Sequence, residues 1–509
     1  MYLRWSTLLL AQLTLFASAD EQPNIVFIFT DDHACQSIGA YGSTINETPN
    51  IDRLAREGAV FYNSFCANSI CGPSRACVLT GKHSHKNGFY SNGRGAFDGS
   101  QFTFPQELQK AGYQTALVGK WHLKSNPTGF DHWEILPGQG AYYNPQFISA
   151  SGKRRIEGYC TTITTDLALE WLEQRDASKP FLLMCQHKAP HRTWAPDLKH
   201  LNNYEDRDIP EPATLFDNWE NRSATLAGNA MSIDKHFYYH YALKVHQEVP
   251  YATARERRLK DGEYARMTAA QKEAWDAAFR PRNEAFLKNP PTGKDLVRWK
   301  YQRYIKNYLR CIDSVDENVG RLLDYLDDQK LTENTIVIYS SDQGFYLGEH
   351  GWYDKRWMFE ESLKMPFLIR WPQHIQPGTR YRQLIQNIVY APTFLDVAGI
   401  EIPSGVQGMS LVPLFHNPEQ TAWRDAIYYH YYEHGGEHQV PRHEGVRTDR
   451  YKLINFYSND GFDLYDLQKD PREMRDVSED PQYASTLEAM KARLIELRKQ
   501  YDLPPLRQG

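Results

Sequence analysis

The chain has 509 residues, of which 41% are hydrophobic and 24% charged, and it contains 28 prolines. With a mean hydropathy of -0.64, this composition excludes a fibre or a bundle of membrane helices and is typical of a loop-rich globular enzyme. The formal net charge of -5 provides no overall basic field, so nucleic-acid binding is excluded as the main role.

Residues 1–19 are typical of a signal peptide. Arg4 precedes an apolar stretch, and Ala17-Ser18-Ala19 supplies the small-residue pattern of a cleavage site. No later segment approaches the roughly 20 unbroken apolar residues of a spanning helix. We therefore expect an exported protein with no transmembrane segment, periplasmic or secreted in a bacterium and lysosomal in a eukaryote.

Four short apolar runs predict buried strands. The runs are residues 24–30, 114–118, 181–185 and 335–339. Each stops at polar residues, which are Asp31-Asp32-His33, Gly119 to His122, Gln186 to His191 and Ser340 to Gly344. Helical patterns over residues 50–58 and 312–328 lie between the runs. The alternation predicts a doubly wound α/β fold, in which ligands bind beyond the carboxyl ends of the strands.

Two later segments differ from this alternation in composition and in the spacing of their apolar residues. Residues from about 225 to 300 are charged and helix-like, and we interpret them as an insertion that covers the site. After about residue 420, short alternating runs predict antiparallel strands, and residues 482–501 predict a final helix. We expect a catalytic domain at residues 20–420 and a smaller C-terminal α+β subdomain, an antiparallel sheet plus a helix, at residues 421–509.

The most specific motif is Cys71-Gly72-Pro73-Ser74-Arg75, with Leu79-Thr80-Gly81 after it. It resembles the signature of type I sulfatases, in which that cysteine is oxidised to formylglycine. Supporting motifs follow the family's order along nearly the whole chain: Asp31-Asp32, residues 48–52, Gly119 to His122, Pro190-His191, Asp342-Gln343-Gly344 and Lys355. The resemblance implies an alkaline-phosphatase-like fold, with a large mixed, mostly parallel sheet flanked by helices.

A divalent cation is the expected cofactor. Asp31, Asp32, Asp342 and the amide oxygen of Gln343 offer an all-oxygen cage for a hard cation, and residue types leave Ca²⁺ and Mg²⁺ open. The resemblance favours Ca²⁺ and implies that Cys71, as formylglycine, joins the ligand set. Gln343 stands where many relatives have Asn, and either amide can ligate. Taken alone, the Asp31-Asp32 pair would more often cap a helix.

The catalytic residues are assigned partly on charge. Arg75, Lys120 and Lys355 supply the cations that attack on a sulfate monoester needs. The resemblance implies that a hydroxyl of hydrated formylglycine at position 71 attacks sulfur, while His191 and Lys355 assist the leaving sugar oxygen. His122 then takes the proton of the remaining hydroxyl, so that sulfate leaves and the aldehyde returns.

Longer stretches narrow the resemblance to N-acetylglucosamine-6-sulfatases of glycan-degrading bacteria. These stretches are residues 127–145, 350–362 and 445–454. The implied substrate is a sulfated oligosaccharide that carries N-acetylglucosamine 6-O-sulfate, as in heparan sulfate, keratan sulfate or mucin glycans. We assign sugar contacts to Arg356, His434, Arg442 and His443, for which a solvated surface position is an equally good interpretation.

Three other functions stay open. They are a sulfatase of another sulfated sugar or aryl sulfate, a phosphoesterase of the same superfamily, and a sulfated-glycan binder in which Cys71 is never converted. Phosphoesterases use Ser or Thr where this chain has Cys71. Conversion needs a partner, either a formylglycine-generating or an anaerobic sulfatase-maturating enzyme. The seven cysteines, an odd number, fit one that is chemically changed.

Overall fold

The computed structural model describes residues 22–246, 254–259, 262–419, 422–436, 438–457 and 461–504. The predicted signal peptide, residues 1–19, lies outside the described residues. Among the helices of the described part, none combines the length and the apolar character needed to cross a membrane.

The strands group into one large sheet and three small ones. They are β1 (Asn24–Thr30), β2 (Ala59–Phe61), β3 (Ser64–Phe65), β4 (Gln114–Lys120), β5 (His132–Leu136), β6 (Gln146–Ser149), β7 (Gly152–Arg155), β8 (Phe181–Gln186), β9 (Thr335–Ser341), β10 (Tyr346–Leu347), β11 (Tyr353–Asp354), β12 (Phe367–Arg370), β13 (Thr379–Tyr381), β14 (Ile385–Gln386), β15 (Ala426–Tyr431), β16 (His443–Thr448), β17 (Tyr451–Phe456) and β18 (Gly461–Asp466). Ten of them form the large sheet, in the order β13-β2-β12-β9-β1-β8-β4-β5-β6-β7.

The centre of the large sheet is parallel. Strands β9, β1, β8, β4 and β5 run in one direction, and β12 and β6 join them antiparallel on either side. All four strands expected from the apolar runs are present. The expected mixed, mostly parallel α/β sheet is therefore confirmed.

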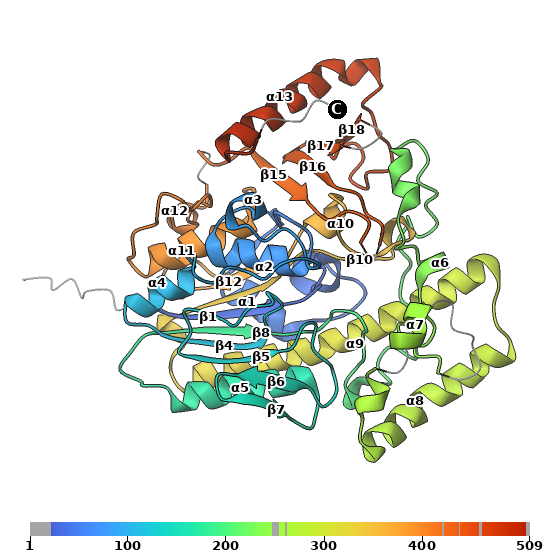
Figure 1. Ribbon diagram of the computed structural model, residues 1–509, viewed down its shortest axis with the longest axis horizontal. Helices are drawn as coiled ribbons and strands as arrows, with labels where there is room; N and C mark the ends of the chain where they lie inside the picture. The colour runs from blue at the N-terminus through green and yellow to red at the C-terminus, as the bar shows by residue number, and fades with distance from the viewer. Residues whose placement is uncertain are drawn as a thin grey trace, which may run out of the picture.

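Helices cover both faces of this sheet (Figure 1). The α-helices of the described residues are α1 (Pro49–Glu57), α2 (Cys71–Thr80), α3 (Ser84–Asn87), α4 (Phe104–Lys110), α5 (Cys160–Gln174), α6 (Ile233–His236), α7 (Ala254–Leu259), α8 (Ala269–Lys288), α9 (Gly293–Asp328), α10 (Glu360–Leu363), α11 (Tyr390–Val397), α12 (Val412–His416) and α13 (Ala484–Gln500). In Figure 1, α2, α4 and α11 lie above the sheet and α5 and α9 below it.

The alternation of side chains along β1 explains the two layers, because successive residues of a strand point to opposite faces. Phe27 and Phe29 enter the hydrophobic cluster under α2, α4 and α11. Val26 and Ile28 enter the second cluster, which α5 and α9 close from the other side.

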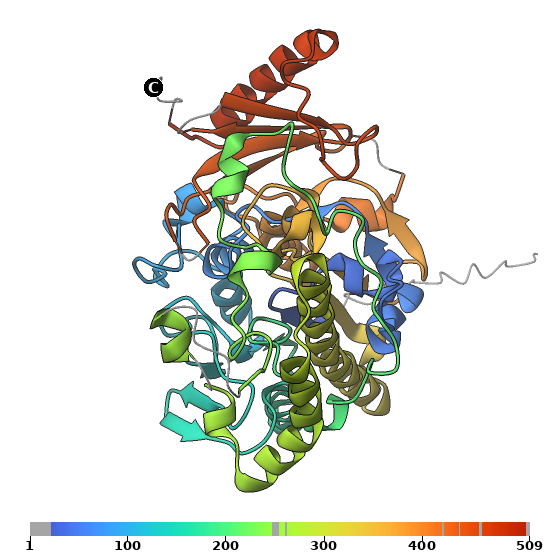
Figure 2. The ribbon, with the colours of Figure 1, turned by 90° about the vertical axis from the view of Figure 1, so that its right-hand side faces the viewer.

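Helix α9 is longer than the pattern over residues 312–328 predicts, since it begins at Gly293. Its first half carries a stripe of aromatic rings, including Tyr301, Tyr304 and Tyr308, which are buried at helical spacing. Before it, the described part of the segment expected as an insertion contains α6, α7 and α8. The ring of Phe286 on α8 stacks on Trp299 of α9, with centroids 3.9 Å apart. Figure 2 shows these helices toward the viewer.

The C-terminal part is an antiparallel sheet, β15-β16-β17-β18, with α13 on one face. The expected α+β subdomain is therefore present. Its other face continues the main core, because Tyr429, Tyr431 and Phe456 belong to the same hydrophobic cluster as Phe27. The backbone N–H of His430 also donates to the carbonyl of Ala67, at 3.1 Å, so the sheet bonds to the segment that leads into α2.

A buried charge group also joins the two parts. The Lys452 ammonium on β17 lies 2.9 Å from Glu360 on α10 and 2.7 Å from Glu473, and neither Lys452 nor Glu473 is appreciably exposed. Arg447 pairs with Glu360 from the same side, at 3.2 Å. Two cations thus face two carboxylates at the seam between the two parts, where Glu360 stays partly exposed.

Candidate active site

The acidic residues of the site emerge side by side from two central strands. β1 and β9 are parallel neighbours with Thr30 opposite Ser341, so Asp31-Asp32 and Asp342-Gln343 leave the sheet at the same edge. The backbone N–H of Asp32 donates to Asp342 Oδ1, at 3.2 Å. Asp32 has a φ of 69°, a left-handed conformation that is uncommon for residues other than glycine.

Three buried carboxylates form the centre of the site. Oxygens of Asp31, Asp32 and Asp342 all lie within 4.8 Å of one another. Each is paired with one of the predicted cations: Asp31 with Lys120, Asp32 with Lys355, and Asp342 with Arg75. Burial raises the pKa of Asp32 to about 7, against the lowering effect of Lys355.

The donor set suits a hard divalent cation. Gln343 gives its amide hydrogen to Asp32 Oδ1, which leaves Gln343 Oε1 buried without a hydrogen-bond donor among the described residues. Asp31 Oδ1 and Asp32 Oδ2 are likewise buried without a hydrogen-bond donor among the described residues. Unsatisfied buried oxygens are costly, and a cation would satisfy all three. The acidic cluster is therefore compatible with a metal site.

Cys71 occupies the first turn of α2 and is 1% exposed. The Lys355 ammonium lies 3.4 Å from its sulfur, and burial raises the pKa of the thiol to about 12. Gly72 allows two loops to approach this turn, because a Cβ there would lie 2.8 Å from Asn92 Oδ1 and 3.1 Å from the His122 carbonyl. In the described part of the chain, all seven cysteines are free thiols.

Arg75 lies one helical turn after Cys71, on the same side of α2. Its guanidinium donates to Gln186 Oε1 at 2.7 Å, to the Lys120 carbonyl at 2.9 Å and to Asp342 at 3.1 Å. These bonds fix the guanidinium of Arg75 against the ends of the strands. The sequence pattern did not reveal the role of Gln186, whose only signal is its place at the end of β8.

Strand β4 delivers Lys120 and His122. Lys120 is fully buried and donates to Gln139 Oε1, at 2.5 Å, besides its pair with Asp31. His122 has a φ of 57°, and its Nδ1 has no hydrogen-bond partner among the described side chains and backbone. Burial lowers the pKa of His122 well below its usual value, and the charges of Lys120 and Arg75 lower it further.

The loop after β8 brings His191 to the same place. Its Nε2 lies 3.7 Å from Asp32 Oδ2, and its Nδ1 bonds to the Arg192 carbonyl, at 2.6 Å. Asp31, Cys71 and His191 also offer ligand atoms within 4.8 Å of one another. The structure therefore brings together all the residues predicted as catalytic or metal-binding: Asp31, Asp32, Cys71, Arg75, Lys120, His122, His191, Asp342, Gln343 and Lys355.

The residues predicted to bind sugar are more scattered. Arg356 adjoins Lys355 and pairs with Asp354, whose other oxygen lies 3.0 Å from His438 Nε2. His434 and Arg442 are exposed. The sequence did not reveal that Asp354 and His438 would hold Arg356 in place.

His443 differs most from its prediction. It has no exposed surface, and its ring lies between 5.3 and 5.7 Å from four others, those of Trp357, Tyr429, Tyr431 and Phe456. The pleat of β16 turns this side chain toward the main core. Direct contact with a sugar at the surface does not fit this position.

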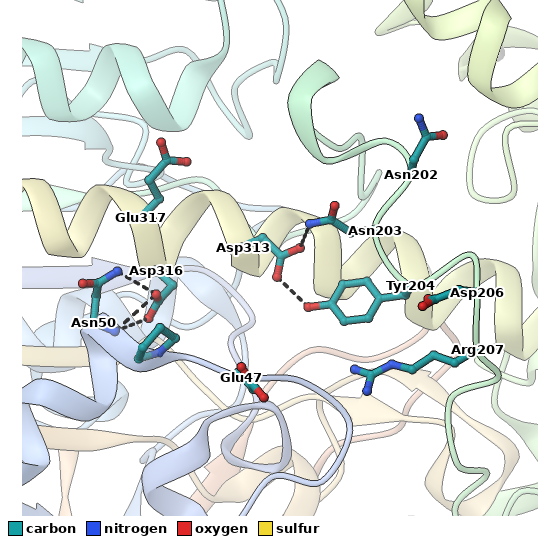
Figure 3. A pocket seen from close by; sticks show the side chains of 11 residues that line it. Glu47, Asn50, Asn202, Asn203, Tyr204, Asp206, Arg207, Asp313, Asp316 and Glu317 are labelled. Carbon is teal, nitrogen blue, oxygen red and sulfur yellow. Dashed lines mark hydrogen bonds between the residues drawn. The ribbon is translucent and has the colours of Figure 1, made fainter.

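An open cavity of about 710 Å³ lies elsewhere, beside α1 and α9 (Figure 3). Five carboxylates line it, from Glu47, Asp206, Asp313, Asp316 and Glu317, against the single cation of Arg207. Figure 3 shows Asp316 accepting hydrogen bonds from Asn50, and Asp313 accepting them from Asn203 and Tyr204. This acidic lining repels anions, so a sulfated sugar is not its ligand.

Comparison with known proteins agrees with the geometry. The family model described as sulfatase matches residues 23–400. The chain belongs to the sulfatase family. A second model, described as the C-terminal part of N-sulphoglucosamine sulphohydrolase, matches residues 348–500.

This sulfatase has a highly similar relative in Bacteroides thetaiotaomicron, named N-acetylglucosamine-6-O-sulfatase. The two are 47% identical over 97% of this chain and 91% of the relative. A solved structure of a protein with its substrate D-glucosamine-2-N,6-O-disulfate superimposes with a TM-score of 0.91, at 46% identity over 96% of this chain and all of that one. A phosphonate monoester hydrolase of Agrobacterium radiobacter, at 20% identity, TM-score 0.71 and 94% and 96% coverage, shares the fold alone.

Proposed function

We propose that this sulfatase hydrolyses the 6-O-sulfate of N-acetylglucosamine in glycosaminoglycans or mucin-type glycans. The observation that carries the proposal is Cys71 at the first turn of α2, with the Lys355 ammonium 3.4 Å from its sulfur and three carboxylates beside it. The 6-O position is supported by the name of the relative that is 47% identical.

Cys71 is proposed to act after conversion to formylglycine by a formylglycine-generating or anaerobic maturating enzyme. The modified residue supplies, as its hydrate, a hydroxyl for attack on sulfur. The motif Cys71 to Arg75 supports conversion, as does the place of Cys71 beside Lys355 and the acidic cluster. Around it, Arg75, Lys120 and Lys355 would bind the sulfate oxygens and neutralise charge that grows during attack.

The cation is proposed to be Ca²⁺, with Mg²⁺ less favoured, and Asp31, Asp32, Asp342, Gln343 and residue 71 would hold it. When bound, it supplies positive charge next to the nucleophile. The assignment is supported by the donor set, because the carboxylate oxygens are buried within 4.8 Å of one another and the Gln343 amide oxygen has no donor among the described residues.

His191 and Lys355 are proposed to assist the leaving sugar oxygen, His191 as the imidazolium, because its Nδ1 hydrogen is already given to the Arg192 carbonyl and only a protonated Nε2 can donate. His122 is proposed to take a proton from residue 71. His122 and His191 suit these roles because they reach the centre from separate strand ends, β4 and β8. Arg356, fixed by Asp354 and His438, and the exposed His434 and Arg442 are proposed to contact the sugar. His443 would affect sugar binding only indirectly, by packing against the aromatic rings around it.

We also propose that the protein is exported by residues 1–19, to the periplasm or the outside. The division into a catalytic domain at 20–420, with its helical insertion near 225–300, and a C-terminal subdomain at 421–509 is part of the same proposal. The change at β15 from a parallel to an antiparallel sheet supports the boundary.

Sulfate release from N-acetylglucosamine-6-sulfate tests the proposal, using protein coexpressed with a formylglycine-generating enzyme. Release that disappears in Cys71→Ala supports the class, the nucleophile and the linkage together. If the residue 71 peptide is converted by mass and no sulfate appears, the 6-sulfate assignment is wrong, and other sulfated sugars, aryl sulfates and phosphate monoesters are the next substrates.

A further inference from the structure

Arg192, the residue after His191, is surrounded by aromatic rings. Its guanidinium carbon lies 5.2 Å from the ring centre of Tyr238, 5.1 Å from that of Tyr241 and 5.2 Å from that of Tyr353. The side chain is buried, at 6% exposure. A guanidinium removed from water is attracted to aromatic faces more strongly than one in solvent.

The three rings belong to two separate parts of the chain. Tyr238 and Tyr241 follow α6, whereas Tyr353 begins β11 and stands two residues before Lys355. Arg192 therefore connects the loop of His191, the hairpin of Lys355 and the segment after α6. His191 and Lys355 are the two groups proposed to act on the leaving oxygen.

Other contacts strengthen the same junction. The buried Lys244 ammonium donates to the Thr193 carbonyl at 2.8 Å and to the Tyr241 carbonyl at 2.7 Å. The ring of Phe237 lies 4.3 Å from that of Tyr353. The segment after α6 is thus bonded to the His191 loop and packed on the Lys355 hairpin at several points.

The backbone of Arg192 fixes His191 itself. Its carbonyl accepts from His191 Nδ1, at 2.6 Å, and from the Lys188 ammonium, at 3.4 Å. This bond leaves Nε2 to face the Asp32 side of the site. A shift in the backbone of residue 192 would move the carbonyl that sets the orientation of the imidazole.

We propose that Arg192 is a positioning residue, whose contacts with Tyr238, Tyr241 and Tyr353 hold His191 and Lys355 toward the same leaving oxygen. The inference rests on the proposed function, because it takes the roles of these two groups from it. It adds that the segment after α6, outside the sulfatase motifs, controls the geometry of leaving-group assistance.

Arg192→Met tests the proposal, since it keeps an unbranched apolar stem and removes the charged, planar guanidinium. We expect kcat on N-acetylglucosamine-6-sulfate to fall about 10- to 100-fold, with KM within about threefold, as for a misplaced catalytic group. On 4-nitrophenyl sulfate, whose phenolate leaves without assistance, the fall should be less than about threefold. Tyr238→Leu should reproduce the difference, and Arg192→Lys should recover it only in part.

Arg207→Met is the matched control, because Arg207 also lies over a tyrosine ring, that of Tyr204 at 5.3 Å, far from these residues in the fold. It should leave both activities unchanged. If Arg192→Met lowers kcat equally on the two substrates, or on neither of them, the proposal is overturned. If wild type releases sulfate from the aryl ester but not from the sugar, the proposed substrate is wrong. In that case a crystal structure of Arg192→Met decides, and an undisplaced His191 ring overturns the inference.

Discussion

The Lys355 ammonium contacts both the Cys71 sulfur, at 3.4 Å, and the Asp32 carboxylate. Burial alone would lower the pKa of Lys355, but the charges of Asp32 and Cys71 outweigh it and the pKa rises. The group therefore stays cationic, between the proposed nucleophile and a proposed metal ligand.

Replacing this cation tests its role. Lys355→Met should lower kcat for sulfate release by about 100- to 1000-fold, because removal of one preorganised donor costs that much. Lys364→Met, a partly buried lysine outside the acidic cluster, is the control and should retain activity. Activity within threefold of wild type in Lys355→Met would contradict the assignment.

Cys71→Ser should abolish sulfate release, by more than about a thousandfold, because it removes the residue that is converted. Mass spectrometry of the peptide should show formylglycine in the wild type and serine in the variant. Cys77→Ala, a buried thiol on the same helix, should keep both the modification and the activity. An unmodified Cys71 in an active protein would exclude the formylglycine mechanism.

Removal of metal should destabilise the protein. Chelation leaves Asp31, Asp32 and Asp342 within 4.8 Å of one another without a shared cation, so the melting temperature should fall by several degrees. Ca²⁺ at 100 times its Kd should restore about 2.7 kcal/mol. In Asp342→Asn the restoration by Ca²⁺ should be much smaller, and an unchanged Ca²⁺ response in that variant would place the ion elsewhere.

His443 should make the protein acid-sensitive. Burial lowers the pKa of His443 from 6.5 to about 4, so between these pH values the unfolded state binds a proton that the folded state does not. The free energy of unfolding is therefore unaffected above pH 6.5 and falls as the pH drops toward 4, by up to ~3 kcal/mol. In urea unfolding at pH 7 and pH 4.5, His443→Phe should lose less free energy than wild type. The partly exposed His132→Phe should lose as much as wild type, and an equal loss in all three would refute the effect.

The seam around Lys452 should be intolerant of a single change. Lys452→Met leaves Glu473 buried without its cation, which should cost about 3–5 kcal/mol in the free energy of unfolding. The double variant Lys452→Met/Glu473→Gln should recover much of this, because it removes both charges. Denaturant titration measures both variants, and no recovery in the double variant would mean that packing, not charge, sets the cost.

The strands that could be predicted from sequence are those buried on both faces. Residues 24–30 and 335–339 are continuous apolar runs, a local signal. β2 and β13 have only three residues each, and their places at one side of the sheet depend on pairing with distant strands. The first half of α9 was missed because its apolar face consists of tyrosines spread among charged residues.

The centre of the site was predictable for another reason, since its residues carry charge or a motif in a recognisable order. Gln139 is a neutral amide that no motif marks, and Gln186 is marked only by its place at the end of β8. His443 shows the reverse case. Its residue type suggested a polar surface contact, but the strand alternation that decides its direction becomes clear only once β16 is paired.

The burial of Cys71 limits when this residue can be modified. At 1% exposure, its side chain is closed to any second protein once α2 has packed. The segment before it is bonded to β15, at His430, and the core above α2 includes Tyr429 and Phe456. Strand β15 and the strands after it therefore leave the ribosome more than 350 residues after Cys71. A maturing enzyme would have to reach Cys71 during that interval, on a chain that is still open.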